Sequence, residues 1–335
     1  ALKNMYLIKG YLNNHKIQVA HDGADTVENF NSKIELKGGN ENLKVGYVGH
    51  LYKGRGIQTL IECAKKLNNI TFHFVGGLNK DIEYWKSYIK KLNLENVYFY
   101  GFVSPVETIK YRNSFDILLA PYEKKVSIFG NHESDTSKFM SPLKIFEYMS
   151  HNKPMIASDF PVIREVLNDK NSILVDCDDI DGWVSSIKKL RDEKNRVLIS
   201  NQALNDFYNY TWKNRGILVL ENIKTRIVYA SKSIIPSRTA NSIHVMKMCQ
   251  AFADNGHEVV LLAPNMPSKY EQDVKDIYEY YGVKINFQIK KLWHPDIIGG
   301  AIIYTLGIFF YLLFNKNFNL VYGRFLHGCY VATFL

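Results

Sequence analysis

The chain has 335 residues, a length typical of two domains that can each bury a full hydrophobic core. Hydrophobic residues make up 46% and charged residues 22%, which is ordinary for a globular protein in water. The net charge of +9 indicates either lysine-rich helix faces or an anionic partner, such as nucleotide phosphates or a membrane surface. We expect no nucleic acid partner, because no basic stretch is combined with the aromatic motif of a nucleic-acid-binding module.

The cysteines and histidines do not form the patterns of a cofactor or metal site. Cys63, Cys177, Cys249 and Cys329 are far apart and form no CxxC pair, so we expect core thiols in a reducing, cytoplasmic compartment. The acidic run DDIDG, residues 178–182, could hold a metal, but we interpret it as the cap of the following helix. We therefore expect neither a metal nor a cofactor.

Between residues 40 and 224, short β-rich runs alternate with segments whose apolar residues recur at helical spacing. The predicted strands cover 43–51, 71–77, 97–103, 116–122, 154–159 and 172–176. The predicted helices cover 57–67, 82–93, 106–115, 141–150 and 161–169, with further helices up to residue 224. This alternation predicts a parallel, doubly wound α/β sheet, in which ligands bind beyond the carboxyl ends of the strands, against helix N-termini.

Two glycine-containing turns follow the first two predicted strands. In GHLYKGRG, residues 49–56, a turn flanked by glycines would let backbone N–H groups approach an anion, and Lys53 and Arg55 would add positive charge. In VGG, residues 75–77, the missing side chains would leave room for a planar base. Each segment can equally be only a tight turn, because neither the ATPase phosphate loop nor the dinucleotide GxGxxG motif is present.

A third feature is the segment SPLKIFEYMSHNKPMIASD, residues 141–159. Ser141 can cap the helix. Pro142 follows it and suits the first helical position. Lys144 and Glu147 are three residues apart and share a helix face, so Glu147 could bind paired sugar hydroxyls or simply form a helical salt bridge with Lys144.

Together, the motifs VGHLYKGRGIQTLI, FVGG, DILLAPY, SPLKIFEYMSHNKPMIASDFPVIREVL and SILVD resemble the nucleotide-sugar-binding domain of family 4 glycosyltransferases. The resemblance covers about residues 40–222 and implies the GT-B fold and a UDP- or GDP-linked sugar donor. In that family a basic residue, here Arg55, contacts the donor diphosphate, and a glutamate, here Glu147, holds the donor ribose. The implied donor-binding set is Gly49, His50, Lys53, Arg55, Gly76, Gly77, Ser141, Leu143, Lys144 and Glu147, of which Arg55 and Glu147 would be catalytic.

The resemblance implies a metal-independent hexosyltransferase that retains the anomeric configuration and acts in bacterial polysaccharide biosynthesis. One departure affects the sugar contacts. Many family members carry a first glutamate eight residues before the second, where this chain has Phe139. Glu133 or Asp135 in the preceding loop could approach the sugar instead.

Residues 225–265 resemble the start of the other GT-B domain, which binds the acceptor and comes first in the family. Residues 1–29 resemble the end of such a domain. We therefore predict three parts: 1–39, the end of an acceptor-side domain; 40–224, the donor domain; and 225–335, the first part of an acceptor-side domain. The chain could be a window from a tandem protein, a rearranged or permuted fragment, or a product of a lost segment.

Candidate acceptor-side residues lie after the predicted strands at 225–233 and 319–325. Arg238, Asn241 and His244 could line the cleft, or belong to a helix start capped by Asn241 or Ser242. Further candidates are Ser237 in the same loop and Arg324 at the end of a later strand, which can equally be a surface arginine.

The uncharged stretch at 297–314 just reaches the length that can span a membrane. We favour a buried or surface helix of the α/β domain, which could dock on the inner face of a membrane beside a glycan or lipid-linked acceptor. Two other functions are open: an incomplete unit that binds a nucleotide-sugar without turnover, and a sugar-nucleotide epimerase of the same fold.

Overall fold

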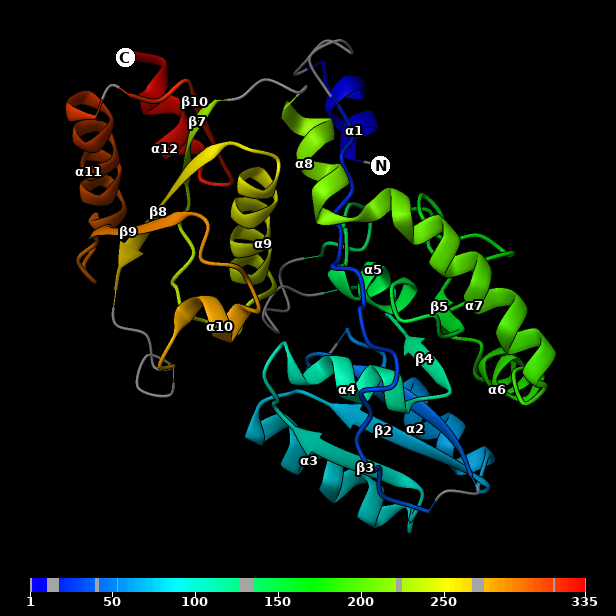
Figure 1. Ribbon diagram of the computed structural model, residues 1–335. Helices are drawn as coiled ribbons and strands as arrows, with labels where there is room; N and C mark the ends of the chain where they lie inside the picture. The colour runs from blue at the N-terminus through cyan, green and yellow to red at the C-terminus, as the bar shows by residue number, and fades with distance from the viewer. Residues whose placement is uncertain are drawn as a thin grey trace. The chain divides into compact units, whose positions relative to one another are not determined.

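The computed structural model describes residues 2–10, 18–39, 42–52, 54–126, 135–220, 225–266, 274–315 and 317–334. The chain forms two compact units, Ala1–Thr211 and Trp212–Leu335, each built on its own parallel sheet (Figure 1). The helix that the sequence places at the end of the first domain belongs to the second unit. Lys53 and Glu133, two of the predicted site residues, lie outside the described residues.

The first unit contains a six-stranded sheet in which every pair of neighbouring strands is parallel. The order is β3-β2-β1-β4-β5-β6, so the chain leaves from the centre in one direction, returns, and continues in the other. This order confirms the predicted doubly wound sheet. The strands are β1 (Leu43–Val48), β2 (Ile70–Val75), β3 (Val97–Gly101), β4 (Ile117–Ala120), β5 (Met155–Ser158) and β6 (Ile173–Val175).

Helices cover both faces of this sheet, as expected when parallel strands are buried on both sides. One core cluster joins the sheet to α2 (Ile57–Lys66), α3 (Asn79–Lys91) and α6 (Ile180–Lys189), and contains the fully buried Trp183. A second cluster joins the opposite face to α4 (Glu107–Ser114), α5 (Leu143–Met149) and α7 (Glu193–Phe207). A short helix, α1 (Leu2–Ile8), lies at the start of the chain.

The predicted helix at 161–169 is wrong, because this segment forms a series of turns. The backbone N–H groups of Ile163 and Arg164 both donate to the carbonyl of Phe160. Those of Val166 and Leu167 both donate to the carbonyl of Ile163. Two carbonyls thus close two successive turns, and the regular ladder of a helix, with one acceptor for each N–H, does not form.

The segment before the first strand is attached to the first unit by side-chain and backbone hydrogen bonds. Asn113, at the end of α4, donates its side-chain amide to the carbonyls of Asn29 and Ser32, both at 3.0 Å. The N–H of Ala24 donates to the carbonyl of Tyr210 at 3.1 Å. Residues 18–39 therefore pack as a strap along the first unit.

The second unit contains a four-stranded parallel sheet in the order β10-β7-β8-β9. Its strands are β7 (Arg226–Ala230), β8 (Glu258–Asn265), β9 (Gln288–Trp293) and β10 (Leu320–Gly323). Its helices are α8 (Trp212–Leu220), α9 (Ala240–Asp254), α10 (Ile277–Tyr281), α11 (Gly300–Phe314) and α12 (Leu326–Val331), with a final 3₁₀ turn at Ala332–Phe334. Strand β9 was not predicted.

The uncharged stretch at 297–314 contains α11, which packs its inner side on the sheet. Among the described residues, no helix has the length and apolarity that a membrane crossing requires. The packing of α11 on the sheet confirms the prediction of a helix within the α/β domain. The four cysteines are free thiols, three of them buried, as predicted for core residues. Burial raises the pKa of the Cys63 thiol to about 12 and that of Cys177 to about 11.

Candidate functional site

Three turns come together at the carboxyl edge of the first sheet, and glycines allow their close approach. The N–H of Gly49, after β1, donates to the carbonyl of Val75 at 2.9 Å. A Cβ on Gly76, after β2, would lie 2.4 Å from the carbonyl oxygen of Gly49. A Cβ on Gly56 would lie 2.5 Å from the Cβ of Pro121, after β4. Each of the three glycines has a positive φ, a backbone conformation that other residues rarely adopt.

This packing changes the expected role of the glycine turns. The N–H groups of Gly49 and Gly76 are used within the fold, the second donating to the carbonyl of Gly101 at 2.7 Å. Gly77 approaches the side chain of Leu51, from which a Cβ would be 2.6 Å away. These two N–H groups are therefore not available to an anion, and the glycines keep the turns narrow.

Arg55 lies between two tyrosine rings in the turn before α2. Its Nη2 donates to the hydroxyl of Tyr52 at 2.7 Å. Its guanidinium carbon is 5.0 Å from the centroid of the Tyr52 ring and 5.8 Å from that of Tyr122. Its buried Nε has no hydrogen-bond partner among the described residues. Arg55 therefore presents an unused donor inside the site.

Lys144 is the second cation of the site and comes from the first turn of α5. Its Nζ lies 3.8 Å from the centroid of the Tyr47 ring and 5.4 Å from that of Tyr122. This nitrogen is buried and has no hydrogen-bond partner in the described part of the chain. Burial, and then the neighbouring Arg55, hold the pKa of Lys144 well below its usual range. An anion would supply the acceptor that this ammonium lacks.

Glycine at position 49 leaves the room that Lys144 occupies. A Cβ there would lie 3.0 Å from the Lys144 Nζ and 3.2 Å from the Tyr47 hydroxyl oxygen. That hydroxyl donates to the carbonyl of His50 at 2.6 Å, which fixes the chain just after β1. The turn after β1 and the start of α5 are thus fitted to one another around the ammonium group.

His50 interacts with the charges of Arg55 and Lys144 and is itself neutral. Its ring stacks on that of Tyr52, with the centroids 5.2 Å apart. Burial, followed by the charges of Arg55 and Lys144, lowers the pKa of His50 to about 4. At neutral pH it can therefore offer a hydrogen bond without adding a third positive charge.

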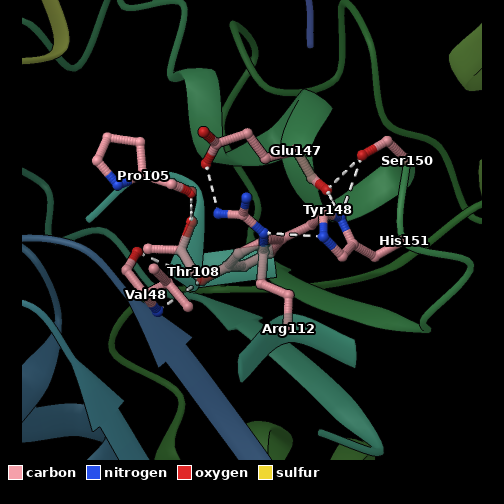
Figure 2. Close-up of polar contacts among 8 residues, drawn as sticks. All are labelled: Val48, Pro105, Thr108, Arg112, Glu147, Tyr148, Ser150 and His151. Atoms are coloured by element: carbon pink, nitrogen blue, oxygen red, sulfur yellow. Dashed lines mark hydrogen bonds and ion pairs between the residues drawn. The ribbon is translucent and has the colours of Figure 1, made fainter. Parts of the chain in front are cut away.

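The predicted salt bridge between Lys144 and Glu147 is wrong, because Glu147 pairs with Arg112 of α4 (Figure 2). The Arg112 Nη1 donates to the Glu147 Oε2 at 3.2 Å, and its Nε donates to the Nε2 of His151 at 3.2 Å. Because that Nε2 accepts, the His151 Nδ1 carries the proton and donates to the backbone carbonyl of Glu147 at 2.5 Å. Arg112 and His151 together hold the helix turn that presents Glu147.

The loop before α5 differs from the expectation in two places. Pro142 is the N-cap residue and no side chain caps the helix, so the predicted cap by Ser141 is wrong. The Ser141 hydroxyl accepts instead from the N–H of Asp22 at 3.4 Å. Asp135 accepts from the N–H groups of Val126 and Ser137, at 3.1 and 2.9 Å, and so stabilises its own loop. Leu143 opens α5 and is half-buried.

The acidic run at 178–182 caps α6, as predicted. Asp179 is the N-cap residue and accepts from the N–H of Gly182 at 2.8 Å. The neighbouring Asp178 forms an ion pair with Lys124 at 2.5 Å. Potential ligand atoms of Asp176, Cys177 and Asp178 lie within 4.8 Å of one another, and the two aspartates are exposed while the cysteine is buried.

In the second unit, the cap of α9 is Thr239, whose side chain accepts from the N–H of Ser242. The predicted caps, Asn241 and Ser242, are therefore wrong. Asn241 donates its amide to the Ser233 hydroxyl at 2.5 Å, and the ring of His244 is buried against that of Trp212, with the centroids 5.4 Å apart. Two further candidates complete the set, Arg238 in the loop before α9 and Arg324, exposed directly after β10.

A family comparison supports the interpretation of the first unit. Residues 42–193 match the family model described as "Glycosyl transferases group 1". This stretch contains Gly49, Arg55, Lys144 and Glu147, so the residues of the site lie within the part of the chain that is similar to this family.

A curated relative is the protein TuaH of Bacillus subtilis (strain 168), named for teichuronic acid biosynthesis as a glycosyltransferase. It is 27% identical over 125 residues, which is 37% of this chain and 28% of the relative. The chain therefore spans less than a third of the length of that relative.

Solved structures agree in fold. A glycosyltransferase from Rickettsia africae ESF-5 is similar with a TM-score of 0.52 at 14% identity, over 64% of this chain and 58% of that one. The sucrose-phosphate synthase of Thermosynechococcus elongatus is similar with a TM-score of 0.50 at 15% identity, over 64% of this chain and 54% of that one. These likenesses support the predicted α/β, GT-B-type architecture of Rossmann-like parallel sheets.

Proposed function

We propose that this chain is part of a retaining glycosyltransferase that transfers a hexosyl group from a UDP- or GDP-linked donor to a glycan or lipid-linked acceptor, without a metal ion. The observation that carries this proposal is the pair of buried cations at the carboxyl edge of the sheet. Arg55 and Lys144 both face the ring of Tyr122, and each has a buried nitrogen without an acceptor among the described residues.

A diphosphate bound between Arg55 and Lys144 would reduce the repulsion between their positive charges. Two like charges in a buried site disfavour one another, which is part of the reason for the depressed pKa of Lys144. A nucleoside diphosphate would bring negative charge and hydrogen-bond acceptors to both nitrogens. The cost of burying the cations would then be offset in the complex, where the donor is held.

The same charges would favour transfer. When the bond between the sugar anomeric carbon and the diphosphate oxygen breaks, negative charge develops on the leaving diphosphate. Arg55 and Lys144 would stabilise this charge from fixed positions, while the neutral His50 donates a hydrogen bond. The acceptor hydroxyl would attack on the same face of the sugar, and its proton would pass to the leaving phosphate oxygen.

Glu147 would bind the ribose of the donor. Arg112 engages one of its carboxylate oxygens, while 30% of the Glu147 side chain remains exposed. The other oxygen can accept hydrogen bonds from ribose hydroxyls, and the ion pair keeps the carboxylate charged and oriented. Arg112 thus acts as a positioning residue behind the nucleotide contact.

The acceptor-side candidates belong to the second unit. Arg238, Asn241, His244 and Arg324 are proposed as acceptor-side residues. A polysaccharide acceptor is favoured by the likeness to the teichuronic acid relative. A unit that binds the nucleotide-sugar without turnover is the second candidate, because the chain spans only part of its relatives.

Calorimetric titration of the chain with UDP and with GDP tests the donor site. We expect one nucleotide to bind, and Arg55→Ala and Glu147→Ala each to weaken that binding by about 1–3 kcal/mol. Arg191→Ala is a matched control, since Arg191 hydrogen-bonds Asn69, which precedes β2 at the opposite edge of the sheet. Equal loss in the control variant, or no binding of either nucleotide, would contradict the proposal.

A chromatographic assay of the bound nucleotide-sugar then separates the two candidate functions. Release of free nucleoside diphosphate with a sugar-modified acceptor supports transfer. Intact donor after incubation with acceptor supports binding without turnover, and interconversion of the sugar itself would support an epimerase.

A further inference from the structure

Tyr122 is a buried residue at the carboxyl edge of the first sheet, and the fold does not use its hydroxyl. The residue follows β4, and its side chain is only 1% exposed. The hydroxyl oxygen is buried and forms no hydrogen bond with the described residues. A buried hydroxyl without a partner costs free energy, because it has given up its hydrogen bonds to water. Its place beside Arg55 and Lys144 indicates that a ligand supplies the partner.

Two other buried tyrosines of the site show the contrast. The Tyr47 hydroxyl donates to the carbonyl of His50 at 2.6 Å. The Tyr148 hydroxyl accepts from the N–H of Val48 at 2.9 Å. Both hydroxyls therefore hold the turn after β1, and a phenylalanine in either place would leave a backbone group without its partner. The hydroxyl of Tyr122 has no such structural task in the described part of the chain.

The main chain at Tyr122 is fixed to the sheet from two sides. Its N–H donates to the Ser158 hydroxyl at 2.7 Å, and the same hydroxyl donates to the Tyr122 carbonyl at 2.8 Å. Ser158 is the last residue of β5 and is fully buried. The preceding residue, Pro121, packs closely on Gly56 at the start of α2. The ring of Tyr122 is therefore presented to the site from a rigid position.

The charges around Tyr122 keep its hydroxyl protonated. The ring centroid lies 5.8 Å from the guanidinium carbon of Arg55 and 5.4 Å from the Lys144 Nζ. Burial raises the pKa of the Tyr122 hydroxyl, Arg55 opposes this effect, and the negative charge of Glu147 adds to it. The hydroxyl is thus a hydrogen-bond donor at neutral pH, and it lies close to both the cations and the carboxylate of the site.

Three buried donors of the site lack an acceptor. The Arg55 Nε, the Lys144 Nζ and the Tyr122 hydroxyl have no hydrogen-bond partner among the described residues. Arginine and a charged lysine only donate, so neither can accept the proton of the hydroxyl. An ionised phosphate offers several acceptor oxygens and matches such a set. A neutral third donor adds a hydrogen bond without the repulsion that a third cation would bring.

We propose that Tyr122 is a third residue that binds the phosphate groups of the sugar donor, and that its hydroxyl donates a hydrogen bond to a phosphate oxygen held between Arg55 and Lys144. The inference rests on the proposed donor site and adds a neutral contact to it. The cations would attract the diphosphate from a distance, whereas the hydroxyl would fix the position of one oxygen, because a hydrogen bond depends on direction as well as on distance.

Calorimetric titration of Tyr122→Phe with inorganic pyrophosphate tests this contact. The substitution removes only the hydroxyl and keeps the ring beside both cations, and pyrophosphate carries neither base nor sugar. We expect the variant to bind pyrophosphate, and whichever of UDP and GDP the chain binds, about tenfold more weakly, with the same factor for both ligands. Unchanged affinity for pyrophosphate would overturn the proposal, and so would a loss confined to the nucleotide, which would assign the hydroxyl to the ribose or the base.

Thermal unfolding of the ligand-free chain separates a binding role from a structural one. Tyr122→Phe should unfold at the same temperature as the unaltered chain or a higher one, because it removes a buried hydroxyl that has no partner. Tyr100→Phe, on β3, is the matched control. Its hydroxyl lies 3.0 Å from the Nδ1 of the buried His73 and accepts from the N–H of Lys37 at 3.0 Å. This control should unfold at a lower temperature and bind pyrophosphate unchanged. A loss of stability in Tyr122→Phe as large as that of the control would overturn the proposal.

The salt dependence of pyrophosphate binding shows whether the hydroxyl acts by itself. Arg55→Ala removes a charge, so its affinity should fall less steeply with added salt than that of the unaltered chain. Tyr122→Phe should keep the full salt dependence. A weaker salt dependence in Tyr122→Phe would show that the substitution displaces a cation, which also contradicts the proposal. If the unaltered chain binds neither pyrophosphate nor a nucleotide, the donor site itself is wrong, and this result is distinct from all the others.

Discussion

Arg112 shows how a residue outside every quoted motif can control a motif residue. Its guanidinium joins Glu147 to His151, and its side chain is only 6% exposed. We expect Arg112→Leu to weaken nucleotide binding by about 1–3 kcal/mol, because Glu147 loses the partner that orients it. Calorimetry measures this loss, and thermal unfolding reports the stability of the variant.

A conservative variant separates charge from geometry at this position. Arg112→Lys keeps a positive charge but cannot donate to both Glu147 and His151 in the same fork. Partial recovery of binding is expected with lysine. If Arg112→Leu binds the nucleotide as tightly as the unaltered chain, the positioning role is wrong.

The low pKa of Lys144 predicts that nucleotide binding is linked to proton uptake. Burial and the neighbouring Arg55 hold this pKa well below the usual range, and a bound diphosphate would favour the ammonium form. Binding should therefore take up protons, and affinity should fall as the pH rises through the depressed pKa. Titration in buffers of different ionisation enthalpy measures the uptake, which should vanish in Lys144→Met. An uptake unchanged in that variant would assign it to another group.

At the scale of elements, the packing of the turn after β1 against the start of α5 determines where the Lys144 ammonium group lies. Gly49 has a φ of 148°, and a Cβ there would lie 3.0 Å from the Lys144 Nζ. Gly49→Ala should displace the ammonium and reduce nucleotide affinity about tenfold, or about 1.4 kcal/mol. Gly39→Ala is the matched control, since Gly39 also has a positive φ but nothing lies within 4 Å of the position of its Cβ.

Comparing these two glycines by calorimetry and thermal unfolding distinguishes backbone strain from the site itself. Both variants should lose some stability, because alanine at positive φ is strained. Only Gly49→Ala should lose nucleotide affinity. A similar loss of affinity in both would show that strain in the first unit, and not the room for Lys144, determines binding.

At the scale of the whole molecule, buried neutral histidines make the chain sensitive to acid. Burial is the first cause that lowers the pKa of His50 to about 4, of His73 to about 3, and of His151 well below 6.5. Above 6.5 these groups are neutral in both states. As the pH falls from 6.5 toward 4, the unfolded chain binds protons that the folded chain does not, so stability falls.

Thermal unfolding across this pH range tests the acid sensitivity. We expect the midpoint to decrease steadily below pH 6.5 and the dependence to become shallower in His73→Asn, which lacks one of the titrating rings. His327→Asn is a control at an exposed position. A midpoint that is constant from neutral pH down to 4 would show that these histidines do not titrate as their burial implies.

The predicted elements that proved right are those with strong local patterns. The apolar runs of β1, β2 and β4 and the amphipathic α2 and α3 lie where the sequence places them. Strand β9, QIKKLW, was missed because an edge strand carries charged residues that interrupt the apolar pattern. The segment at 161–169 has helical spacing, but its backbone closes turns on Phe160 and Ile163.

The sequence by itself determined the doubly wound sheet and brought Arg55, Lys144 and Glu147 to its carboxyl edge, because alternating periodicity and strand ends are local properties. Only the tertiary structure decided which partners these residues have. Arg112 lies 35 residues before Glu147, and Tyr122 follows β4 whereas Tyr47 belongs to β1. Caps, ion pairs and the space left by Gly49 depend on distances across the fold, which no short sequence pattern records.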